Sequence, residues 1–324
     1  MKTVREIGQG VMIVRSLQSR WLSGALAAAV LTIGGGCAPA GTDVAPAGET
    51  EVVVAPTLDE LAAATFTGIF DRPITLHQGR WEGEPFDPNG VSRPSVGLVD
   101  DFLLTGDLDA DGREEAVVLL WSSSGGSGTR LYLTVMGTRD EGIENLGTKL
   151  IGDRVQVRSA SHKEQVITLD LVQAGPGDAM CCPTQKAAKS WRLTEDGLAM
   201  VASEVTGTLS LVDLEGPLWT LTELGWDQAV PEGVEITLAF EDGKVSGSGG
   251  CNRYFGGVIS EAPGELTFSA MGATRMACAE PAMGLEQRYL ATLSTASQYS
   301  FIACRLALSC VTEDGVVTLL FESR

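Results

Sequence analysis

An acidic motif offers the clearest chemistry in this sequence. In the segment GDLDADGREEAVVLL, Asp107, Asp109 and Asp111 stand at every second position before a glycine. Carboxylate oxygens at this spacing are able to wrap a hard cation, and the glycine permits the sharp turn that wrapping needs. The twelfth position of the motif is Val118 and not the Glu of an EF-hand. The motif therefore predicts calcium as the candidate cofactor, with a β-hairpin turn capped by its own aspartates as the alternative.

Cysteines offer the second kind of chemistry. The chain has seven, and six remain when Cys37, which follows an apolar N-terminal run, is set aside. An even number suits a fully paired exported protein, although six cysteines allow fifteen connectivities. We expect three pairs, each within one supersecondary unit: Cys181–Cys182, Cys251–Cys278 and Cys304–Cys310. The adjacent pair also leaves a soft-metal site and a thiol–disulfide redox role open as alternatives.

Histidines and basic residues are scarce, which argues against several classes of function. The two histidines, His77 and His162, lie far apart in the sequence. This argues against a histidine-rich zinc site and a Ser-His-Asp hydrolase, and we interpret His77 as structural. The formal net charge is -19, and so acidic a chain repels phosphate backbones, which excludes nucleic acid as a partner. We expect a protein that is not an enzyme and that has no certain cofactor.

The N-terminal residues resemble the export signal of a bacterial lipoprotein. Two arginines precede the run WLSGALAAAVLTI, which suits a signal-peptide core and is too short to span a bilayer comfortably. Three glycines and Cys37 follow. This order is similar to a lipobox, in which the signal peptide is cut before a cysteine that then carries acyl chains such as palmitate. Gly34 stands where Leu is usual, which leaves a plain secretory signal as the alternative.

The leader predicts how the protein reaches its compartment. We assign residues 1–36 to a signal peptide, starting at Met1 or Met12, and residues 37–58 to a lipidated Cys37 and a flexible tether rich in Ala, Pro and Gly. The expected partner is a membrane, bound through the lipid anchor, and the expected location is the cell envelope, facing the periplasm or the exterior. Residue 39 is Pro and not the Asp that retains some lipoproteins at the inner membrane, which favours the outer membrane in a Gram-negative host. The sequence identifies no protein or small-molecule partner.

Short β-like runs dominate residues 59–205. Runs such as EEAVVLLWSS, TRLYLTVMGT and QVITLDLVQ are rich in β-branched or alternating apolar residues, and turn clusters such as DADG and SSGGSG separate them. We expect an antiparallel β-rich domain. Its acidic loop is similar to the loop of integrin-type FG-GAP repeats, in which such a turn between strands binds calcium. One copy is visible in the sequence, whereas a propeller needs several blades.

A linker over residues 206–213 leads to a second domain over residues 214–324, which carries a recognisable set of motifs. A glycine-rich turn enters the block GCNRY, a strand LTF follows, and the turn TRMAC precedes the helical segment AEPAMGLEQRYLATL. Together with Trp219, Leu221, Met271 and Glu286, these motifs resemble the META domain of HslJ-like bacterial lipoproteins. The members of the motif that we expect to matter structurally are Gly250, Asn252, Arg253, Thr274, Arg275 and Met276.

The resemblance implies a compact domain with an antiparallel sheet and one main helix, so the expected fold class of the chain is α+β and mostly β. Family members often have Gly-Asp before the penultimate strand, where this chain has Cys304 and Arg305. The family is associated with envelope stress and supplies no catalytic residue. We therefore expect a non-enzymatic exported lipoprotein that acts in envelope maintenance, stress response or binding. The alternatives are a calcium-dependent binding module built on the Asp107–Asp111 loop, and a redox protein that uses Cys181 and Cys182.

Overall fold

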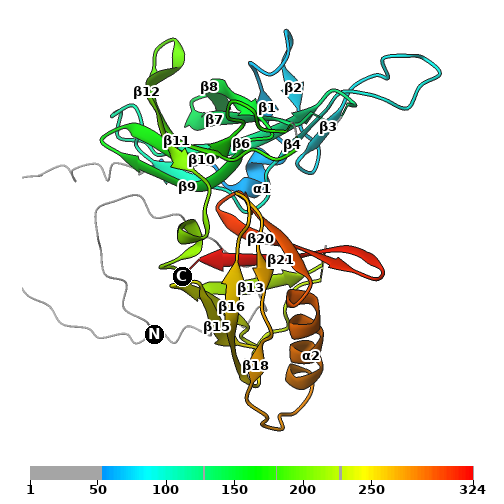
Figure 1. The fold of residues 1–324 in the computed structure, drawn as a ribbon. Coiled ribbons are helices and arrows are strands. Elements are labelled where there is room, and N and C mark those ends of the chain that lie inside the picture. The colour runs from blue at the N-terminus through cyan, green and yellow to red at the C-terminus, as the bar shows by residue number, and fades with distance from the viewer. Residues whose placement is uncertain (1–52, 127, 180, 226–227, 324) are drawn as a thin grey trace, which may run out of the picture.

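The computed structural model of the protein describes residues 53–126, 128–179, 181–225 and 228–323, so the leader and Cys37 lie outside the described residues. The described chain is mostly β, and all of its strand pairs are antiparallel, which confirms the predicted fold class. Residues 53–208 form an N-terminal domain, and residues 211–323 form a C-terminal domain that lies below it in Figure 1.

The N-terminal domain begins with a short capped helix. Helix α1 (Leu58–Leu61) starts after Thr57, whose hydroxyl accepts the amide of Glu60, while the Glu60 carboxylate accepts the amide of Thr57. This reciprocal capping satisfies two amides that the helix leaves free. The hairpin of β1 (Thr65–Phe66) and β2 (Ile74–Thr75) follows. The carbonyl of Val53 accepts the amide of Glu114, so chain contacts with this domain begin ahead of residue 59.

A six-stranded sheet forms the centre of this domain. Its strands are β3 (Arg80–Glu82), β4 (Ser95–Leu98), β5 (Leu104–Gly106), β6 (Glu115–Ser123), β7 (Arg130–Arg139) and β8 (Gly142–Asp153). Strand β6 is buried on both faces because its side chains alternate between two cores. Ala116 and Val118 face the core under α1, β1 and β2, whereas Val117 and Leu119 face a second, four-stranded sheet.

The second sheet packs against the first through apolar side chains. Its strands, in sheet order, are β12 (Gly197–Thr208), β11 (Gln185–Thr194), β10 (Val166–Gln173) and β9 (Gln156–Lys163). Trp191 and Ile167 from this sheet are fully buried together with Leu119 and Leu133 from the other sheet. Strand β9 stands at the end of the sheet, so one of its edges lacks a neighbouring strand of the same sheet.

The C-terminal domain is one curled sheet with a helix. A 3-10 helix η1 (Leu211–Leu214) leads into it. Its strands are β13 (Trp219–Leu224), β14 (Thr237–Glu241), β15 (Lys244–Ser248), β16 (Arg253–Ile259), β17 (Thr267–Phe268), β18 (Gly272–Ala273), β19 (Ala296–Ile302), β20 (Arg305–Thr312) and β21 (Gly315–Ser323). The two ends of this sheet, β17 and β19, meet through a bridge between Glu265 and Gln298, so the sheet closes around a single apolar core.

Helix α2 (Ala282–Leu293) covers that core (Figure 1). Leu285, Tyr289 and Leu293 recur at helical spacing and are buried, as is Glu286. The hydroxyls of Tyr289 and Tyr254 lie 2.8 Å apart, so the two buried rings satisfy each other's polar atoms. Among the described residues, the structure contains no helix long and apolar enough to cross a membrane.

The two domains touch through the hairpin of β19 and β20, whose orange ribbon reaches toward the N-terminal domain in Figure 1. The amide of Cys304, in the turn of this hairpin, donates to the carbonyl of Val157 on β9 at 2.9 Å. The thiol-bearing residue itself belongs to the core of the N-terminal domain. The position at which this sequence departs from the expected family pattern is therefore a point of contact between the domains.

The predicted pairing of Cys304 with Cys310 is wrong. Both cysteines are free and buried. Cys304 lies in the hairpin turn, and Cys310 lies six residues further along the same chain on β20. An extended strand rises about 3.3 Å per residue, so the two residues stand about 20 Å apart, well beyond the reach of a disulfide. Sequence proximity suggested a local pair, and the extended conformation prevents it.

We expect these two thiols not to react with thiol reagents in the folded protein. Burial raises the pKa of both Cys304 and Cys310 to about 12, so neither forms a thiolate at neutral pH. In a Cys37→Ser background without reductant, an Ellman assay should detect about two thiols per chain after denaturation and nearly none before it. Detection of no thiols in the denatured, unreduced protein would contradict the structure, because it would require Cys304 and Cys310 to be oxidised.

Candidate functional site

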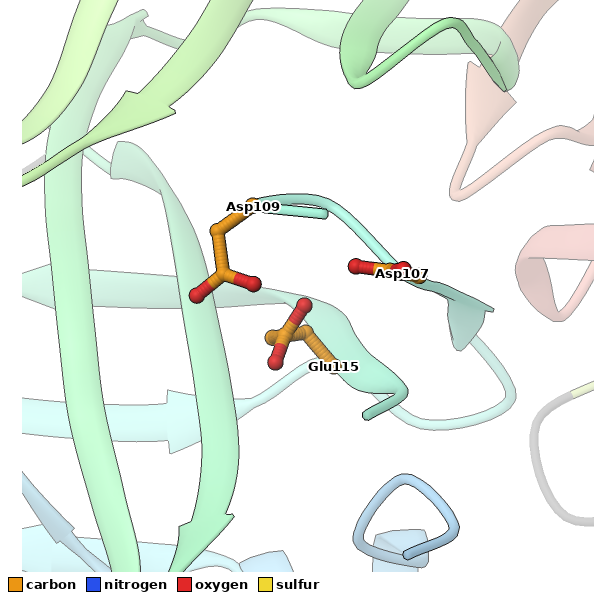
Figure 2. Close-up of side chains that lie close together, drawn as sticks. All are labelled: Asp107, Asp109 and Glu115. Atoms are coloured by element: carbon orange, nitrogen blue, oxygen red, sulfur yellow. The ribbon is translucent and has the colours of Figure 1, made fainter. Parts of the chain in front are cut away.

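The acidic loop joins β5 to β6, and its carboxylates point toward one another (Figure 2). Oxygens of Asp107, Asp109 and Glu115 lie within 4.8 Å of one another. A calcium ion bound at about 2.4 Å holds opposite oxygen ligands about 4.8 Å apart, so these three residues are close enough to share one ion. Oδ1 of Asp107 is buried and has no hydrogen-bond partner among the described residues.

The same loop also caps its own backbone. Oδ2 of Asp107 accepts the amide of Gly112 at 3.2 Å, and Oδ1 of Asp109 accepts the amide of Asp111 at 3.1 Å. These contacts form the aspartate-capped turn that the sequence offered as the alternative to a cation site. They use one oxygen of each carboxylate, so the turn and a cation site do not exclude each other.

Asp111, the third predicted ligand, is not part of the carboxylate group. Its Oδ1 accepts the amide of Arg113 at 2.8 Å, and its Oδ2 lies 3.6 Å from Nη2 of Arg139 on β7, so it adjoins the group through that arginine and not through a shared set of oxygens. Glu115 takes its place because β6 begins there and turns that side chain inward. Sequence reasoning missed Glu115, although the two-residue spacing from Asp107 to Asp111 reaches it after two further steps.

Arg139 on β7 supplies the counter-charge of this group. Its Nη2 lies 3.0 Å from Oδ2 of Asp109 and 3.2 Å from Oε1 of Glu115. Glu115 is fully buried, and its Oε2 accepts the amide of Leu108 at 2.9 Å. Burial raises the pKa of Glu115 above its usual range, while the Leu108 amide and the Arg139 guanidinium act in the opposite direction. A cation at this site would compete with Arg139 for the same oxygens.

The cysteine pair 181–182 lies on the surface, between β10 and β11. Cys181 and Cys182 form a disulfide, and both residues are exposed. Asp178 closes the loop, since its Oδ2 accepts the amides of Gly175 and Thr184 at 2.8 and 2.7 Å. These two amides lower the pKa of Asp178. The contacts give the loop a defined shape, and the redox role of the pair stays a prediction.

The two histidines make structural contacts. Nε2 of His162 lies 2.9 Å from the carbonyl of Thr105, which fixes the ring against β5. His77 exchanges backbone hydrogen bonds with Arg80 across a tight turn. The contacts of His77 are those of its backbone, and its structural role stays a prediction.

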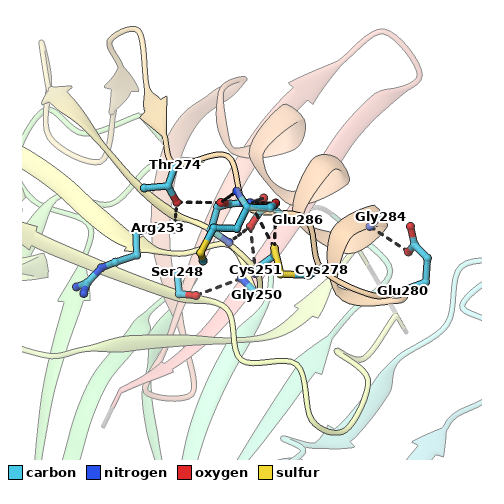
Figure 3. The surroundings of a disulfide bond; sticks show 11 residues. Ser248, Gly250, Cys251, Arg253, Thr274, Cys278, Glu280, Gly284 and Glu286 are labelled. Atoms are coloured by element: carbon cyan, nitrogen blue, oxygen red, sulfur yellow. Dashed lines mark hydrogen bonds between the residues drawn. A yellow bond between two sulfur atoms is a disulfide. The ribbon is translucent and has the colours of Figure 1, made fainter.

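Asn252 is the centre of a polar network in the C-terminal domain. Figure 3 labels two of its partners, Thr274 and Glu286. Its Oδ1 accepts the Thr274 hydroxyl at 2.9 Å and the Met276 amide at 2.6 Å. Its Nδ2 donates to the Met276 carbonyl at 3.2 Å and to Oε1 of Glu286 at 2.8 Å. One side chain therefore links the glycine-rich turn, the segment before α2, and α2 itself.

Glu286 holds the other side of the glycine-rich turn. Its Oε2 accepts the backbone amides of Cys251, at 3.1 Å, and of Asn252. A Cβ added at Gly249 would lie 2.7 Å from Cγ of Glu286, so this turn approaches the helix too closely for a larger residue. The carboxylate is buried, and the amides that face it offset the cost of removing its charge from water.

The remaining members of the predicted motif divide into two groups. Gly250 has a φ of 105° and supplies backbone freedom in the turn, whereas Arg253 and Arg275 are exposed, and Arg253 extends away from the network in Figure 3. A disulfide between Cys251 and Cys278 closes the loop that holds the network, with a Cα–Cα distance of 5.9 Å. In the chain-entropy model such a loop contributes roughly 3–4 kcal/mol. The glycine-rich block is a structural centre of the C-terminal domain.

We expect Asn252→Ala to lower the free energy of unfolding of the protein by about 2–3 kcal/mol, because the Met276 amide and Glu286 in the C-terminal domain would lose a buried partner. Urea denaturation followed by tryptophan fluorescence measures this change. Ser246→Ala is the matched control, since Ser246 is exposed on the neighbouring strand β15. Equal stability of Asn252→Ala and the control would show that the network does not hold the domain together.

Comparisons with known proteins identify the family of the second domain. Residues 212–324 match the family model of the META domain, which confirms that part of the sequence interpretation. No curated protein matches the sequence. Two solved structures are similar to part of the chain. One, described as the NMR structure of the protein from Burkholderia xenovorans, is 29% identical, covers 34% of this chain and 83% of its own, and has a TM-score of 0.29. The other, also an NMR structure, is 25% identical, covers 35% of this chain and 94% of its own, and has a TM-score of 0.29.

Proposed function

Because residues 212–324 are a META domain, we propose that the protein is a non-enzymatic exported lipoprotein of the bacterial cell envelope. In this proposal a lipid on Cys37 anchors the chain to a membrane. The two domains then lie outside the cytoplasm, where they act in envelope maintenance, in the response to stress, or in binding.

Cysteine oxidation is the observation that carries the proposal. Cys251 and Cys278 form a disulfide, and so do Cys181 and Cys182. Disulfides form and persist outside the reducing cytoplasm, so two pairs in one chain support export. The two remaining cysteines of the described residues are buried.

Polar side chains that would be candidates for catalysis serve the fold instead, which supports a binding or maintenance role. Asn252 and Glu286 hold a turn against α2, and Nε2 of His162 lies against a backbone carbonyl. The hydroxyls of Tyr254 and Tyr289 bond to each other, and burial raises the pKa of both well above the usual range. None of these groups is free to activate a substrate.

Lipidation is tested on the full-length protein expressed with a bacterial export system. We expect the wild type to incorporate an alkyne analogue of palmitate and to sediment with membranes, and we expect Cys37→Ser to lose both properties because it lacks the thiol that is acylated. Cys181→Ser is the matched control, since Cys181 is an exposed cysteine outside the leader. Equal labelling of Cys37→Ser and the control would refute the anchor.

Calcium binding is a second candidate function, favoured by the carboxylate group of the acidic loop. Asp107, Asp109 and Glu115 present oxygens within 4.8 Å of one another, and one oxygen of Asp107 is buried and has no partner in the described chain. Backbone carbonyls and water would have to complete the six to eight ligands that calcium takes. Arg139 already neutralises part of the charge, so the affinity should lie in the weak range of extracellular sites, about 0.1–1 mM.

Isothermal titration with calcium chloride at pH 7 tests this site. We expect heat of binding from the wild type and none from Asp107→Asn, because the substitution removes a carboxylate oxygen from the group. Asp140→Asn is the matched control, as Asp140 is a fully exposed acid next to β7 and outside the group. The calcium candidate is dismissed if the wild type gives no heat, or if Asp107→Asn binds as the wild type does.

A further inference from the structure

The turn between β19 and β20 consists of residue types that its backbone does not favour. Strand β19 ends at Ile302 and β20 begins at Arg305, so Ala303 and Cys304 form a two-residue hairpin turn. Both have positive φ, 47° and 69°. A two-residue turn with positive φ at both positions favours Asn and Gly, because a Cβ is crowded in the left-handed region. An apolar residue at each position needs an explanation outside the hairpin.

The surroundings of the turn supply that explanation. Cys304 is 6% exposed and belongs to the apolar core of the N-terminal domain, together with Val157 on β9 and Leu171 on β10. Ala303 packs against the same core. Asn at either position would place an amide in an apolar environment, whereas Ala and Cys are small and apolar enough to enter it.

Two backbone amides of the hairpin donate hydrogen bonds to residues at the edge of a sheet in the N-terminal domain. The Cys304 amide donates to the Val157 carbonyl at 2.9 Å, and the Phe301 amide donates to Oε1 of Gln156 at 3.0 Å. Because β9 is the last strand of its sheet, the turn covers part of an edge that would otherwise be open to pairing with another chain.

Ion pairs flank this contact on both sides. Nη1 of Arg305 lies 3.3 Å from Oδ2 of Asp101 in the N-terminal domain, and Nη2 of Arg158 lies 3.0 Å from Oδ1 of Asp213 in η1. The guanidinium of Arg158 also lies 5.4 Å from the ring centre of Phe301. The side chains of Asp213 and of both arginines are largely shielded from water, so separating the domains would expose charges that are now paired.

We propose that Ala303 and Cys304 are a docking element whose partner surface is the β9 edge of the N-terminal domain. Ala303 and Cys304 suit the contact between the domains better than they suit the hairpin turn that they form. Docking has two consequences. It makes the two domains unfold together, and it fixes the orientation of the acidic loop relative to the META domain. This inference is independent of the proposed function.

Calorimetry of the full chain tests the proposal. The first variant, Ala303→Asn with Cys304→Gly, gives the turn the sequence that its backbone favours and removes the apolar side chain from the other domain. The matched control is Glu164→Asn with Gln165→Gly, in the two-residue turn between β9 and β10. Those residues have φ values of 49° and 60°, so the control has the same backbone geometry within a single domain.

We expect the wild type to unfold in one cooperative transition and the docking variant to unfold in two. The transition of the N-terminal domain should fall by roughly 4 °C or more, because that domain loses a buried side chain, while the C-terminal transition should not fall. The control should keep one transition at or above the wild-type midpoint. Cys304→Ser keeps the turn backbone and replaces the buried thiol with a hydroxyl. It should separate the two transitions in the same direction, by a smaller interval.

Two results would overturn the proposal. A single transition in both the docking variant and Cys304→Ser, at any midpoint, would show that the turn does not couple the domains. Two independent transitions in the wild type would show that no coupling exists to be lost.

Discussion

A carboxylate that leaves water must find donors within the protein, and this requirement shapes both domains. In the C-terminal domain, Glu286 on α2 accepts two backbone amides and the Asn252 side chain, so the helix, the glycine-rich turn and the following segment meet at one point. In the N-terminal domain, Glu115 accepts the Leu108 amide and faces Arg139, which fixes the acidic loop on the sheet. The two sites solve the same problem with different donors.

The difference between these two carboxylates separates a structural site from a candidate functional one. Glu286 faces neutral amide donors, and all of the hydrogen bonds described for it come from the Cys251 and Asn252 amides and the Asn252 side chain. Glu115 lies beside two further acids, Asp107 and Asp109, and Arg139 supplies the positive charge that faces it. Three carboxylates that share one arginine leave surplus negative charge, which is what a hard cation binds.

The contact between the domains holds the two carboxylate sites in one arrangement relative to each other. A short turn from the C-terminal sheet enters the core of the N-terminal domain, and paired charges surround it. The META domain thus serves here as a partner of a second, β-rich domain.

The sequence alone determined the features that depend on local pattern. Alternating apolar residues and turn clusters predicted antiparallel sheets, helical spacing predicted α2, and the GCNRY and TRMAC motifs identified the META domain. The pairing partners of side chains depended on contacts that no local pattern encodes. Glu115 replaced Asp111 in the acidic group because strand β6 turns it inward, and Cys304 and Cys310 stayed apart because an extended strand separates them. Local sequence sets backbone preference, whereas burial against distant strands decides which side chains meet.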